Sequence, residues 1–461
     1  MIHLESMTVE EIVKAVDGEL LAGDRETVVT KICIDSREAG EGSLFVPIIG
    51  EKVDAHRFIP QVFEQGAAAT FTSKNEITES GKAQIKVVDT VKALGTLAAY
   101  YRKKFDMPVV GITGSVGKTS TKEMVSAALE TGFQTMKTAG NQNSQIGVPL
   151  TLFRMEHTMN MAVVEMGISE FGEMDNLVRF AAPDVAVVTN IGEAHIAQFG
   201  KKENTRTEKL KIASGFNDKN CLFLNGDDPL LFEAAKTQTC PVRLFGTRPE
   251  CDYRAENIAV KDGKNTFTMI YPGGEEDIVI RQLGMHNVLN ALAAMAVAEH
   301  FGIKPAMSKK GLEAYEGIAM RQQINHLSKG IKVIDDSYNA SPASVRSGVD
   351  VLMQLDNPGR KMAVLGDILE LGEVSRQYHY DTGVSIADAG LDVVLTVGNE
   401  MKALAEALKD SGKEMIVESF DENEAVIEWL NAHLSDGDAV LVKGSRGMHE
   451  EEVVEALKAR F

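Results

Sequence analysis

Short apolar runs alternate with helical patterns through the middle of the chain. Apolar residues recur at helical spacing over residues 91–105, and residues 107–113 then read as a buried strand that runs into a glycine-rich turn. Two further apolar runs, residues 161–165 and 184–189, flank a helix-like stretch at 173–180. This alternation is typical of a parallel sheet with crossover helices. It predicts an α/β domain in the middle third.

The same alternation restarts after a helical stretch at residues 287–301. Apolar runs are separated there by helical stretches such as residues 400–410. The runs are residues 331–335, 361–365, 393–397 and 439–442. A second α/β unit at the C-terminal end fits this pattern.

The first part of the chain has strand-like runs, such as residues 43–49, and one helical pattern. We therefore predict an α/β protein of three domains. Residues 1–84 form a small α+β domain, residues 85–317 a central mononucleotide-binding α/β domain with a mostly parallel sheet, and residues 318–461 a Rossmann-like α/β domain. A length of 461 residues agrees with about three domains of roughly 150 residues each.

Composition narrows the classes of function. A hydrophobic content of 44% and a charged content of 25% are those of a globular protein. The formal net charge of −19 repels nucleic acid and anionic membranes, so an anionic ligand needs a local cation or a metal. Neither a leader peptide nor a membrane-spanning run of about 18 apolar residues is evident. We expect a cytoplasmic monomer that binds no nucleic acid and enters no membrane, with its four cysteines reduced and buried.

The strongest chemical signal is the glycine-rich turn at residues 111–119, Gly-Ile-Thr-Gly-Ser-Val-Gly-Lys-Thr. Its backbone N–H groups can converge on phosphate oxygens, Lys118 supplies a positive charge, and the Thr119 hydroxyl can bind Mg²⁺. The glycines lie three apart, so the turn is a variant of the usual phosphate-binding loop. The alternative is a plain turn with an exposed lysine. The strand, the Gly-Lys-Thr triplet and the following helix together favour a nucleoside triphosphate.

Two residues at the ends of later strands are candidate metal ligands. Glu165 ends the next buried strand, where its carboxylate can bind Mg²⁺ or cap the following helix. His195 follows a third strand end, where it can coordinate a metal or be an ordinary hydrogen-bonded histidine. Lys209 and Lys211 lie on a predicted helix beyond it, and their spacing alone indicates solvated surface lysines.

Polar residues also gather in the last third of the chain. Asn287 and Asn290 open an alanine-rich helix, where they can contact an adenine edge or cap the helix. Clusters at residues 335–342, 366–367 and 443–447 each follow a predicted strand. They belong either to one shared cleft or to three separate turns.

The order and spacing of several motifs resemble those of the Mur ligases, ATP-dependent amide-forming enzymes of peptidoglycan precursor synthesis. The resemblance spans nearly the whole chain. Its motifs are Asp-Ser-Arg at residues 35–37, Gly-Ser-Leu-Phe-Val at 42–46, Thr-Gly-Ser-Val-Gly-Lys-Thr-Ser-Thr-Lys at 113–122 and Lys-Gly-Ser-Arg at 443–446. Residues 121–123, 336–340 and 365–372 are similar to the branch that adds D-alanyl-D-alanine, and the D-N-P-R/N motif of the preceding ligase is absent.

The resemblance implies ATP and two Mg²⁺ ions as cofactors. Thr119 and Glu165 would hold one ion, and His195 with a carbamylated Lys209 would hold the other. Lys118, Lys209 and His195 would be the catalytic residues. The glutamate usual two positions after the modified lysine is Lys211 here, which leaves Lys211 as the alternative. Two further departures are Ser341, where asparagine is common, and residues 50–56, where Asp-Gly-His is typical.

The resemblance also implies which residues bind nucleotide and substrate. The nucleotide-binding residues would be Gly114, Ser115, Val116, Gly117, Lys118, Thr119, Ser120, Asn287, Asn290, Arg321, Asp336 and Asn339. The substrate residues would be Ser36 and Arg37 in the UDP-sugar-binding first domain, Asn141, Asn143 and Ser144 near the muramoyl group, and Lys443 and Arg446 near the incoming dipeptide.

The activity so implied joins two small molecules. The terminal carboxylate of UDP-N-acetylmuramoyl-tripeptide would attack the γ-phosphate of ATP, and the amine of D-Ala-D-Ala would attack the resulting acyl phosphate. The alternatives are another ligase step of the family with a different amino-acid acceptor, and a nucleotide-gated switch protein. Neither the general base for the amine nor the third amino acid of the tripeptide can be identified in the sequence.

Overall fold

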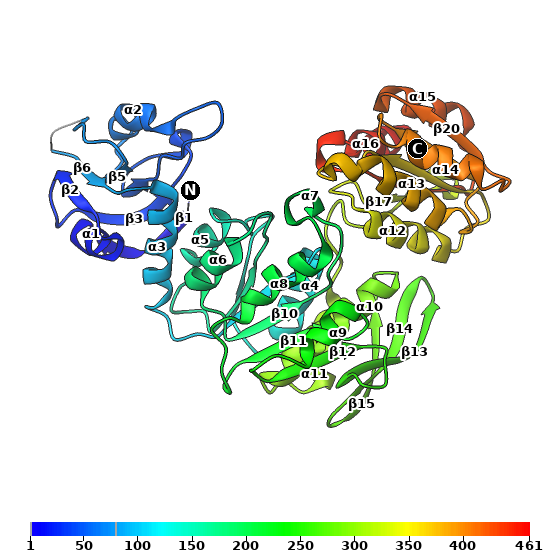
Figure 1. The fold of residues 1–461 in the computed structure, drawn as a ribbon, viewed down its shortest axis with the longest axis horizontal. Helices are drawn as coiled ribbons and strands as arrows, with labels where there is room; N and C mark the ends of the chain where they lie inside the picture. The colour runs from blue at the N-terminus through cyan, green and yellow to red at the C-terminus, as the bar shows by residue number, and fades with distance from the viewer. Residues whose placement is uncertain (1, 79–80) are drawn as a thin grey trace.

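The computed structural model describes residues 2–78 and 81–461, which form three sheets with their helices (Figure 1). The first sheet has the order β1-β3-β4-β5-β6-β2, parallel from β3 to β6 with an antiparallel strand at each edge. Two helices accompany it, although the sequence predicted one. The elements are β1 (Ile2–Thr8), α1 (Val9–Val16), β2 (Glu19–Ala22), β3 (Val28–Cys33), β4 (Ser43–Phe45), α2 (Ile59–Glu64), β5 (Ala69–Thr72) and β6 (Ala83–Lys86).

The central sheet has the order β15-β14-β13-β12-β11-β10-β7-β9-β8. The strands from β8 to β13 in this order are parallel, as predicted, and β13, β14 and β15 form an antiparallel meander that the sequence analysis did not predict. The strands are β7 (Val109–Thr113), β8 (Thr135–Lys137), β9 (Met161–Glu165), β10 (Val185–Val188), β11 (Cys221–Asn225), β12 (Val242–Gly246), β13 (Tyr253–Lys261), β14 (Lys264–Tyr271) and β15 (Gly274–Ile280).

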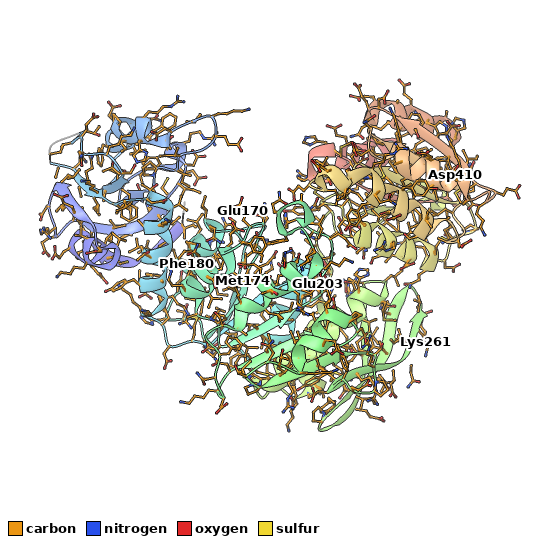
Figure 2. All side chains as sticks on the ribbon, viewed as in Figure 1. Glu170, Met174, Phe180, Glu203, Lys261 and Asp410 are labelled. Atoms are coloured by element: carbon orange, nitrogen blue, oxygen red, sulfur yellow. The ribbon has the colours of Figure 1, made fainter. Side chains whose placement is uncertain are left out.

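The helices of this region cover both faces of the central sheet. Residues of α4 and α10 share a core with one face, and residues of α3 and α6 pack against the other. Figure 2 shows Met174 and Phe180 on α6, and both are buried there. The helices are α3 (Thr90–Arg102), α4 (Lys118–Leu129), α5 (Gly147–Leu152), α6 (Glu173–Ala181), α7 (Ile196–Phe199), α8 (Lys202–Leu210), α9 (Pro229–Ala235), α10 (Met285–His300) and α11 (Pro305–Ala314).

The third sheet has the order β16-β17-β21-β18-β19-β20 and is parallel except for the edge strand β16. Helices α12, α13 and α14 pack on one face and α15 and α16 on the other, so its inner strands are buried on both sides. The elements are β16 (Gln323–His326), β17 (Lys332–Asp335), α12 (Pro342–Gln354), β18 (Lys361–Gly366), α13 (Ser375–Ile386), β19 (Val393–Val397), α14 (Lys402–Asp410), β20 (Ile416–Phe420), α15 (Asn423–His433), β21 (Ala439–Lys443) and α16 (Glu451–Arg460).

The predicted three-domain α/β architecture is confirmed. The boundary predicted between residues 84 and 85 falls inside β6, so we propose that the first domain extends to Lys86. The boundary after Gly317 precedes β16 and stays our proposal for the start of the third domain. The four cysteines are free thiols, and all but the half-buried Cys240 are buried. In the described ranges, no helix is both long enough and apolar enough to cross a membrane.

Candidate active site

The glycine-rich turn lies between β7 and the N-terminus of α4, as predicted. Gly114 has φ +152°, and a Cβ atom there would lie 1.9 Å from the Thr189 Oγ1 atom. Gly117 has φ +83° and is the N-cap residue directly before α4. Other residues rarely adopt these backbone angles, so the glycines let the turn close tightly over the start of the helix. The positive end of the α4 dipole faces the turn.

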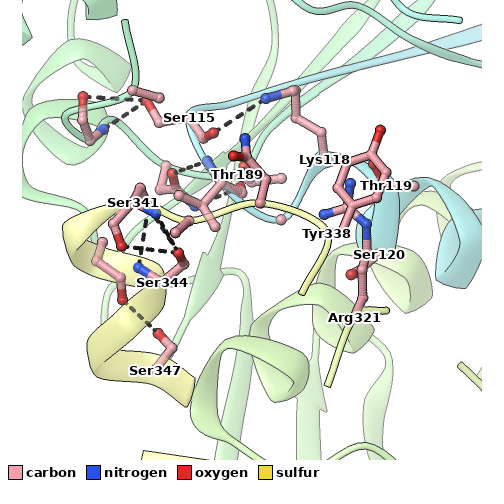
Figure 3. Close-up of a pocket in the computed structure, with 18 of the residues that line it drawn as sticks. Ser115, Lys118, Thr119, Ser120, Thr189, Arg321, Tyr338, Ser341, Ser344 and Ser347 are labelled. Carbon is pink, nitrogen blue, oxygen red and sulfur yellow. Dashed lines mark hydrogen bonds between the residues drawn. The ribbon is translucent and has the colours of Figure 1, made fainter. Parts of the chain in front are cut away.

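The segment that follows β10 holds this turn in place. The Thr189 hydroxyl and the Asn190 side-chain amide both donate to the Val116 carbonyl, at 2.6 and 2.9 Å. Asn190 Oδ1 accepts from the Val116 N–H at 2.9 Å. The Ser115 Oγ atom accepts from the Gly192 N–H at 2.8 Å (Figure 3). The turn is therefore pre-organised by the neighbouring strand end.

Lys118 lies directly over the turn. Its ammonium donates to the carbonyls of Gly114 and Ser115, at 2.9 and 3.2 Å. Burial lowers the pKa of Lys118, the nearby Glu165 carboxylate raises it, and Arg321 adds a further lowering effect. The lysine thus places a partly buried amine beside the loop, in the lining of the cleft.

Glu165 is 1% exposed and lies between the turn and the next loop. Its Oε1 accepts from the Thr119 hydroxyl at 3.2 Å and from the Asn143 amide at 2.7 Å. Its Oε2 is buried, and no donor among the described residues reaches it. Capping of the next helix is ruled out, because α6 begins after Gly172. A buried carboxylate oxygen beside a threonine hydroxyl is a ligand set that suits Mg²⁺.

His195 lies at the start of α7, in the left-handed region at φ 58°. Burial lowers its pKa and the nearby Lys118 lowers it further, while Glu370 opposes this effect. The imidazole is therefore neutral near pH 7, which is the form that binds metals. Its Nδ1 is 2.9 Å from the Glu370 Oε2 atom.

The two candidate lysines have opposite environments. Lys209 is 1% exposed, so the interpretation of it as a surface lysine was wrong. Burial lowers its pKa well below the ordinary value, and Lys118 lowers it further. Lys211 forms ion pairs with Asp175 and Glu208, at 2.8 and 2.9 Å, and these hydrogen bonds raise its pKa. Only Lys209 thus has an environment that favours a neutral amine.

The two asparagines of α10 connect the helix to the turn. The Asn290 Oδ1 atom accepts from the Thr121 hydroxyl at 2.9 Å, and its amide donates to the Asn287 Oδ1 atom at 3.2 Å. The Asn287 amide donates to the Leu283 carbonyl at 2.8 Å, so neither side chain caps the helix, which begins after Gly284. The capping interpretation was therefore wrong.

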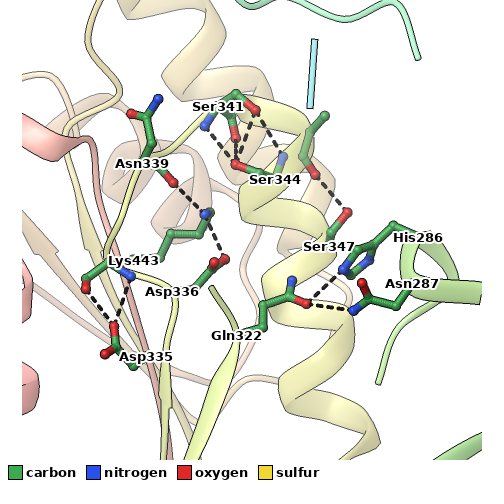
Figure 4. Close-up of polar contacts among 12 residues, drawn as sticks. His286, Asn287, Gln322, Asp335, Asp336, Asn339, Ser341, Ser344, Ser347 and Lys443 are labelled. Carbon is green, nitrogen blue, oxygen red and sulfur yellow. Dashed lines mark hydrogen bonds and ion pairs between the residues drawn. The ribbon is translucent and has the colours of Figure 1, made fainter. Parts of the chain in front are cut away.

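The segment before β16 adds two residues to this corner. The Gln322 Oε1 atom lies 2.8 Å from the His286 Nε2 atom and accepts from the Asn287 amide at 3.3 Å (Figure 4). The Arg321 guanidinium lies over the Tyr338 ring, 4.2 Å from its centre. The Gln322 contacts join α10 of the central domain to the C-terminal domain, whereas the Arg321 contact lies within the C-terminal domain.

The polar clusters of the C-terminal domain meet at the carboxyl ends of β17, β21 and β18, which are neighbours in the sheet. Lys443 is buried and forms an ion pair with Asp336 at 2.8 Å, and it donates to the Asn339 carbonyl at 2.8 Å (Figure 4). Arg446 forms an ion pair with Glu451 at 3.0 Å. The shared cleft is confirmed for the clusters at residues 335–342 and 443–447, which both line one cavity, whereas Gly366 and Asp367 are not part of its lining.

A cavity of about 850 Å³ lies between the central and C-terminal domains and brings most of the predicted residues together. Its lining includes Ser115, Val116, Gly117, Lys118, Thr119, Ser120, Asn141, Asn143, Ser144, Glu165, His195, Asn287, Asn290, Arg321, Asp336, Asn339, Lys443 and Arg446. Gly114 and Lys209 are not among its lining residues. Ser36 and Arg37 lie apart, on the 3-10 helix Ser36–Glu38 of the first domain. No cluster of three or more His, Cys, Asp or Glu side chains placed to hold a metal exists in residues 2–78 and 81–461, so a bound ion would need other ligands as well.

Comparisons with known proteins agree with this arrangement. Three family models match the chain in succession: "Mur ligase family, catalytic domain" at residues 28–102, "Mur ligase middle domain" at 112–298 and "Mur ligase, glutamate ligase domain" at 320–446. The UDP-N-acetylmuramoyl-tripeptide–D-alanyl-D-alanine ligase of Bacillus subtilis is 38% identical over 98% of both chains. The chain belongs to the Mur ligase family.

Solved structures of Mur ligases share its fold. MurF from Acinetobacter baumannii superimposes with a TM-score of 0.93 at 31% identity, over 99% of this chain and 100% of that one. MurF from Thermotoga maritima, solved in complex with ADP, gives 0.84 at 27% identity, over 93% and 97%. The family expected from the motifs is confirmed.

Several residues of this Mur ligase cleft were missed by the sequence analysis. Thr189 and Asn190 could have been found, because they directly follow β10, the strand beside β7, at the sheet edge where ligands collect. Gln322 and Glu370 also line the cleft. Their roles depend on contacts across the two domains, which local sequence patterns do not report.

Proposed function

We infer that this Mur ligase uses ATP to join D-alanyl-D-alanine to UDP-N-acetylmuramoyl-tripeptide in peptidoglycan precursor synthesis. The observation that carries this inference is the complete phosphate-binding turn in the cleft of a chain similar over its full length to D-Ala-D-Ala ligases. The substrates are small molecules. The tripeptide supplies a carboxylate and the dipeptide supplies an amine.

The reaction has two steps. A carboxylate oxygen of the tripeptide attacks the γ-phosphorus of ATP, ADP leaves and an acyl phosphate forms. The amine of the dipeptide then attacks the acyl carbon, phosphate leaves, and the nitrogen loses a proton as the amide forms. Bringing the carboxylate to the triphosphate is opposed by charge repulsion. Lys118 and the N–H groups of the turn supply the local positive charge that a chain of net charge −19 otherwise lacks.

The residues of the cleft fit two Mg²⁺ ions, which would neutralise phosphate charge and orient the γ-phosphoryl group. Thr119 and the unpaired oxygen of Glu165 would hold one, and His195 with Lys209 the other. The observation that supports the first is the buried Glu165 Oε2 beside the Thr119 hydroxyl. The neutral imidazole of His195 supports the second.

A lysine binds a metal only after it has lost its positive charge. The buried Lys209 favours the neutral amine, whose nitrogen can attack CO₂ to give a carbamate and release a proton. The carbamate is an anionic ligand with two oxygens. Lys211 is held as an ammonium by Asp175 and Glu208, so we propose Lys209 as the modified residue.

The remaining assignments are also our proposals. The first domain would hold the UDP-sugar through Ser36 and Arg37, and Asn141, Asn143 and Ser144 would contact the muramoyl group. Asn287, Asn290, Arg321, Asp336 and Asn339 would contact the nucleotide together with the turn. Lys443 and Arg446 would hold the dipeptide, and we propose a monomeric enzyme of the cytoplasm.

Phosphate release tests the function directly. The purified chain is mixed with ATP and Mg²⁺ in four reactions, which contain neither substrate, UDP-tripeptide alone, D-Ala-D-Ala alone, or both. The amounts of released phosphate and of amide product are measured in each. We expect one phosphate per amide, and only when UDP-tripeptide and D-Ala-D-Ala are both present. A nucleotide-gated switch would instead release phosphate without them, and another ligase of the family would require a different amino acid.

A further inference from the structure

The loop between β18 and α13 carries a sequence motif that the proposed mechanism does not use, residues 366–372. The Asp367 carboxylate accepts from the N–H groups of Asn399 and Met401, at 3.1 and 2.8 Å, near the start of α14. The Leu369 N–H donates to the Ser445 Oγ atom at 2.9 Å. The loop is thus fixed to its own domain, including the Lys443–Arg446 segment that we assign to the dipeptide.

The tip of this loop reaches the central domain. Glu370 has φ +64°, in the left-handed region that disfavours residues other than glycine. Gly372 has φ +61°, and a Cβ atom there would lie 3.0 Å from the Ala197 Cβ atom of α7. The strained backbone of Glu370 persists only because surrounding contacts hold it. In this conformation the Glu370 side chain contacts His195 at the start of α7.

The contact made at this tip is with His195. The Glu370 Oε2 atom lies 2.9 Å from His195 Nδ1, which joins the C-terminal domain to the central one. A neutral imidazole has one N–H group and one lone pair. A carboxylate cannot donate, so Nδ1 carries the hydrogen and the lone pair is left on Nε2. Metal-binding histidines commonly have such a carboxylate on the nitrogen that does not bind the metal.

We propose that Glu370 is a positioning residue that the C-terminal domain supplies to the metal-binding His195. This inference rests on the proposed function, because it takes His195 as a Mg²⁺ ligand. Glu370 fixes the ring orientation and the tautomer that present Nε2 to the ion. The affinity of that ion then depends on docking of the domain that carries the dipeptide loop. Phosphoryl transfer is thereby favoured when the acceptor domain is in place.

A plain ion pair between domains is the competing explanation, since the Glu370 side chain is 63% exposed and exposed ion pairs contribute little to stability. Three variants of the full chain separate the two. E370Q keeps an oxygen that accepts from Nδ1 but loses the charge. E370G removes the side chain at a φ that suits glycine, so the loop backbone is not strained further. E373Q changes an exposed carboxylate of the same loop and serves as the control.

The main readout is binding of Mn²⁺, measured by electron paramagnetic resonance with a non-hydrolysable ATP analogue. We expect two bound ions in the wild type. E370G should bind the weaker ion roughly 10- to 100-fold less tightly, while E370Q stays within about threefold of wild type and E373Q equals it. Two ions bound normally by E370G, equal losses in E370Q and E370G, or a single ion in the wild type would each overturn the proposal.

Turnover supplies the second readout. The Mg²⁺ concentration needed for half-maximal rate should rise in E370G, while kcat at saturating Mg²⁺ should recover. An unrecovered kcat would overturn the positioning role. Because Mn²⁺ binding is measured without tripeptide or dipeptide, a wrong acceptor assignment would appear in the phosphate-release assay alone and would leave this result unchanged.

Discussion

Two lysines only two positions apart differ in whether they can lose a proton. Lys209 is buried beside Lys118, whereas Lys211 is paired with Asp175 and Glu208. We predict that Lys209→Ala lowers ligase turnover by roughly 100-fold or more, because even groups behind the metal ligands are worth 10- to 100-fold. Short carboxylic acids such as formate should restore part of it by replacing the carbamate.

Lys211→Ala is the matched control, measured in the same amide-formation assay. It should keep turnover close to wild type, with no response to added acid. Full activity of the Lys209 variant, or rescue of the Lys211 variant by added acid, would mean that Lys211 is the modified residue.

Glu450 is a second residue whose charge depends on the fold. Its side chain is fully buried where β18 and β21 end, close to Gly366 and Gly444, and neither carboxylate oxygen meets a donor in the described part of the chain. Burial, together with the like charges of Asp367, Glu451 and Glu452, raises its pKa from 4.5 to about 8. The folded protein therefore retains a proton that the unfolded chain releases.

This shift makes stability depend on pH. The protonated carboxyl stabilises the fold fully below pH 4.5, and that stability is lost as pH rises through about 8. Each pKa unit is worth about 1.4 kcal/mol, so the total is on the order of a few kcal/mol.

The single tryptophan, Trp429, lies on α15 and reports unfolding of the C-terminal domain by fluorescence. In urea titrations from pH 5 to 8, Glu450→Gln should lose less stability than wild type, and parallel curves would contradict the assignment.

At the scale of an element, the phosphate-binding turn requires glycine at position 114, where it packs against Thr189. A Cβ at Gly114 would lie 1.9 Å from Thr189 Oγ1 at a φ of +152°. We predict that Gly114→Ala weakens binding of an ATP analogue at least about tenfold, because a displacement costing 1–3 kcal/mol disturbs the turn. Calorimetric titration measures this effect. Gly215→Ala is the control, since no heavy atom beyond its chain neighbours, within the described ranges, lies within 4 Å of its Cβ position. Equal affinities in both variants would show that the turn tolerates the change.

Elements with a buried apolar run could be predicted from the sequence almost to the residue. The runs at residues 161–165 and 393–397 coincide with β9 and β19. The meander was missed, although residues of β14 alternate between buried and partly exposed positions as a one-sided strand does. The strand predicted at residues 43–49 is only Ser43–Phe45, because Pro47 has no N–H group for the sheet.

The candidate site was predictable where its residues are close in sequence. Lys118 and Thr119 follow from the local glycine pattern, and Glu165 from its place at a strand end. The burial of Lys209 and the Glu370–His195 contact result from packing between separate elements. Neither hydrophobic periodicity nor a sequence motif indicates such packing, so these two features could be found only in the structure.

At the scale of the whole molecule, the first two domains share one hydrophobic core, whereas the third has cores largely its own. Tyr101 of α3 joins the first two, because its hydroxyl donates to the Met155 carbonyl and accepts from the Glu5 N–H, both at 2.9 Å. The cleft is not part of this junction, because it lies between the central and C-terminal domains. The site that would activate the tripeptide is thus built from the central and C-terminal domains, and we propose that the acceptor approaches from the C-terminal domain.

The central claim is that the tripeptide carboxylate itself is phosphorylated by ATP. The most direct test labels that carboxylate with ¹⁸O and analyses the released phosphate by mass spectrometry after ligation to D-Ala-D-Ala. One oxygen of the carboxylate must leave with phosphorus when the amine attacks an acyl phosphate. We predict one ¹⁸O atom in each phosphate released from fully labelled substrate. Phosphate free of label would mean that water attacks ATP, and would contradict the account.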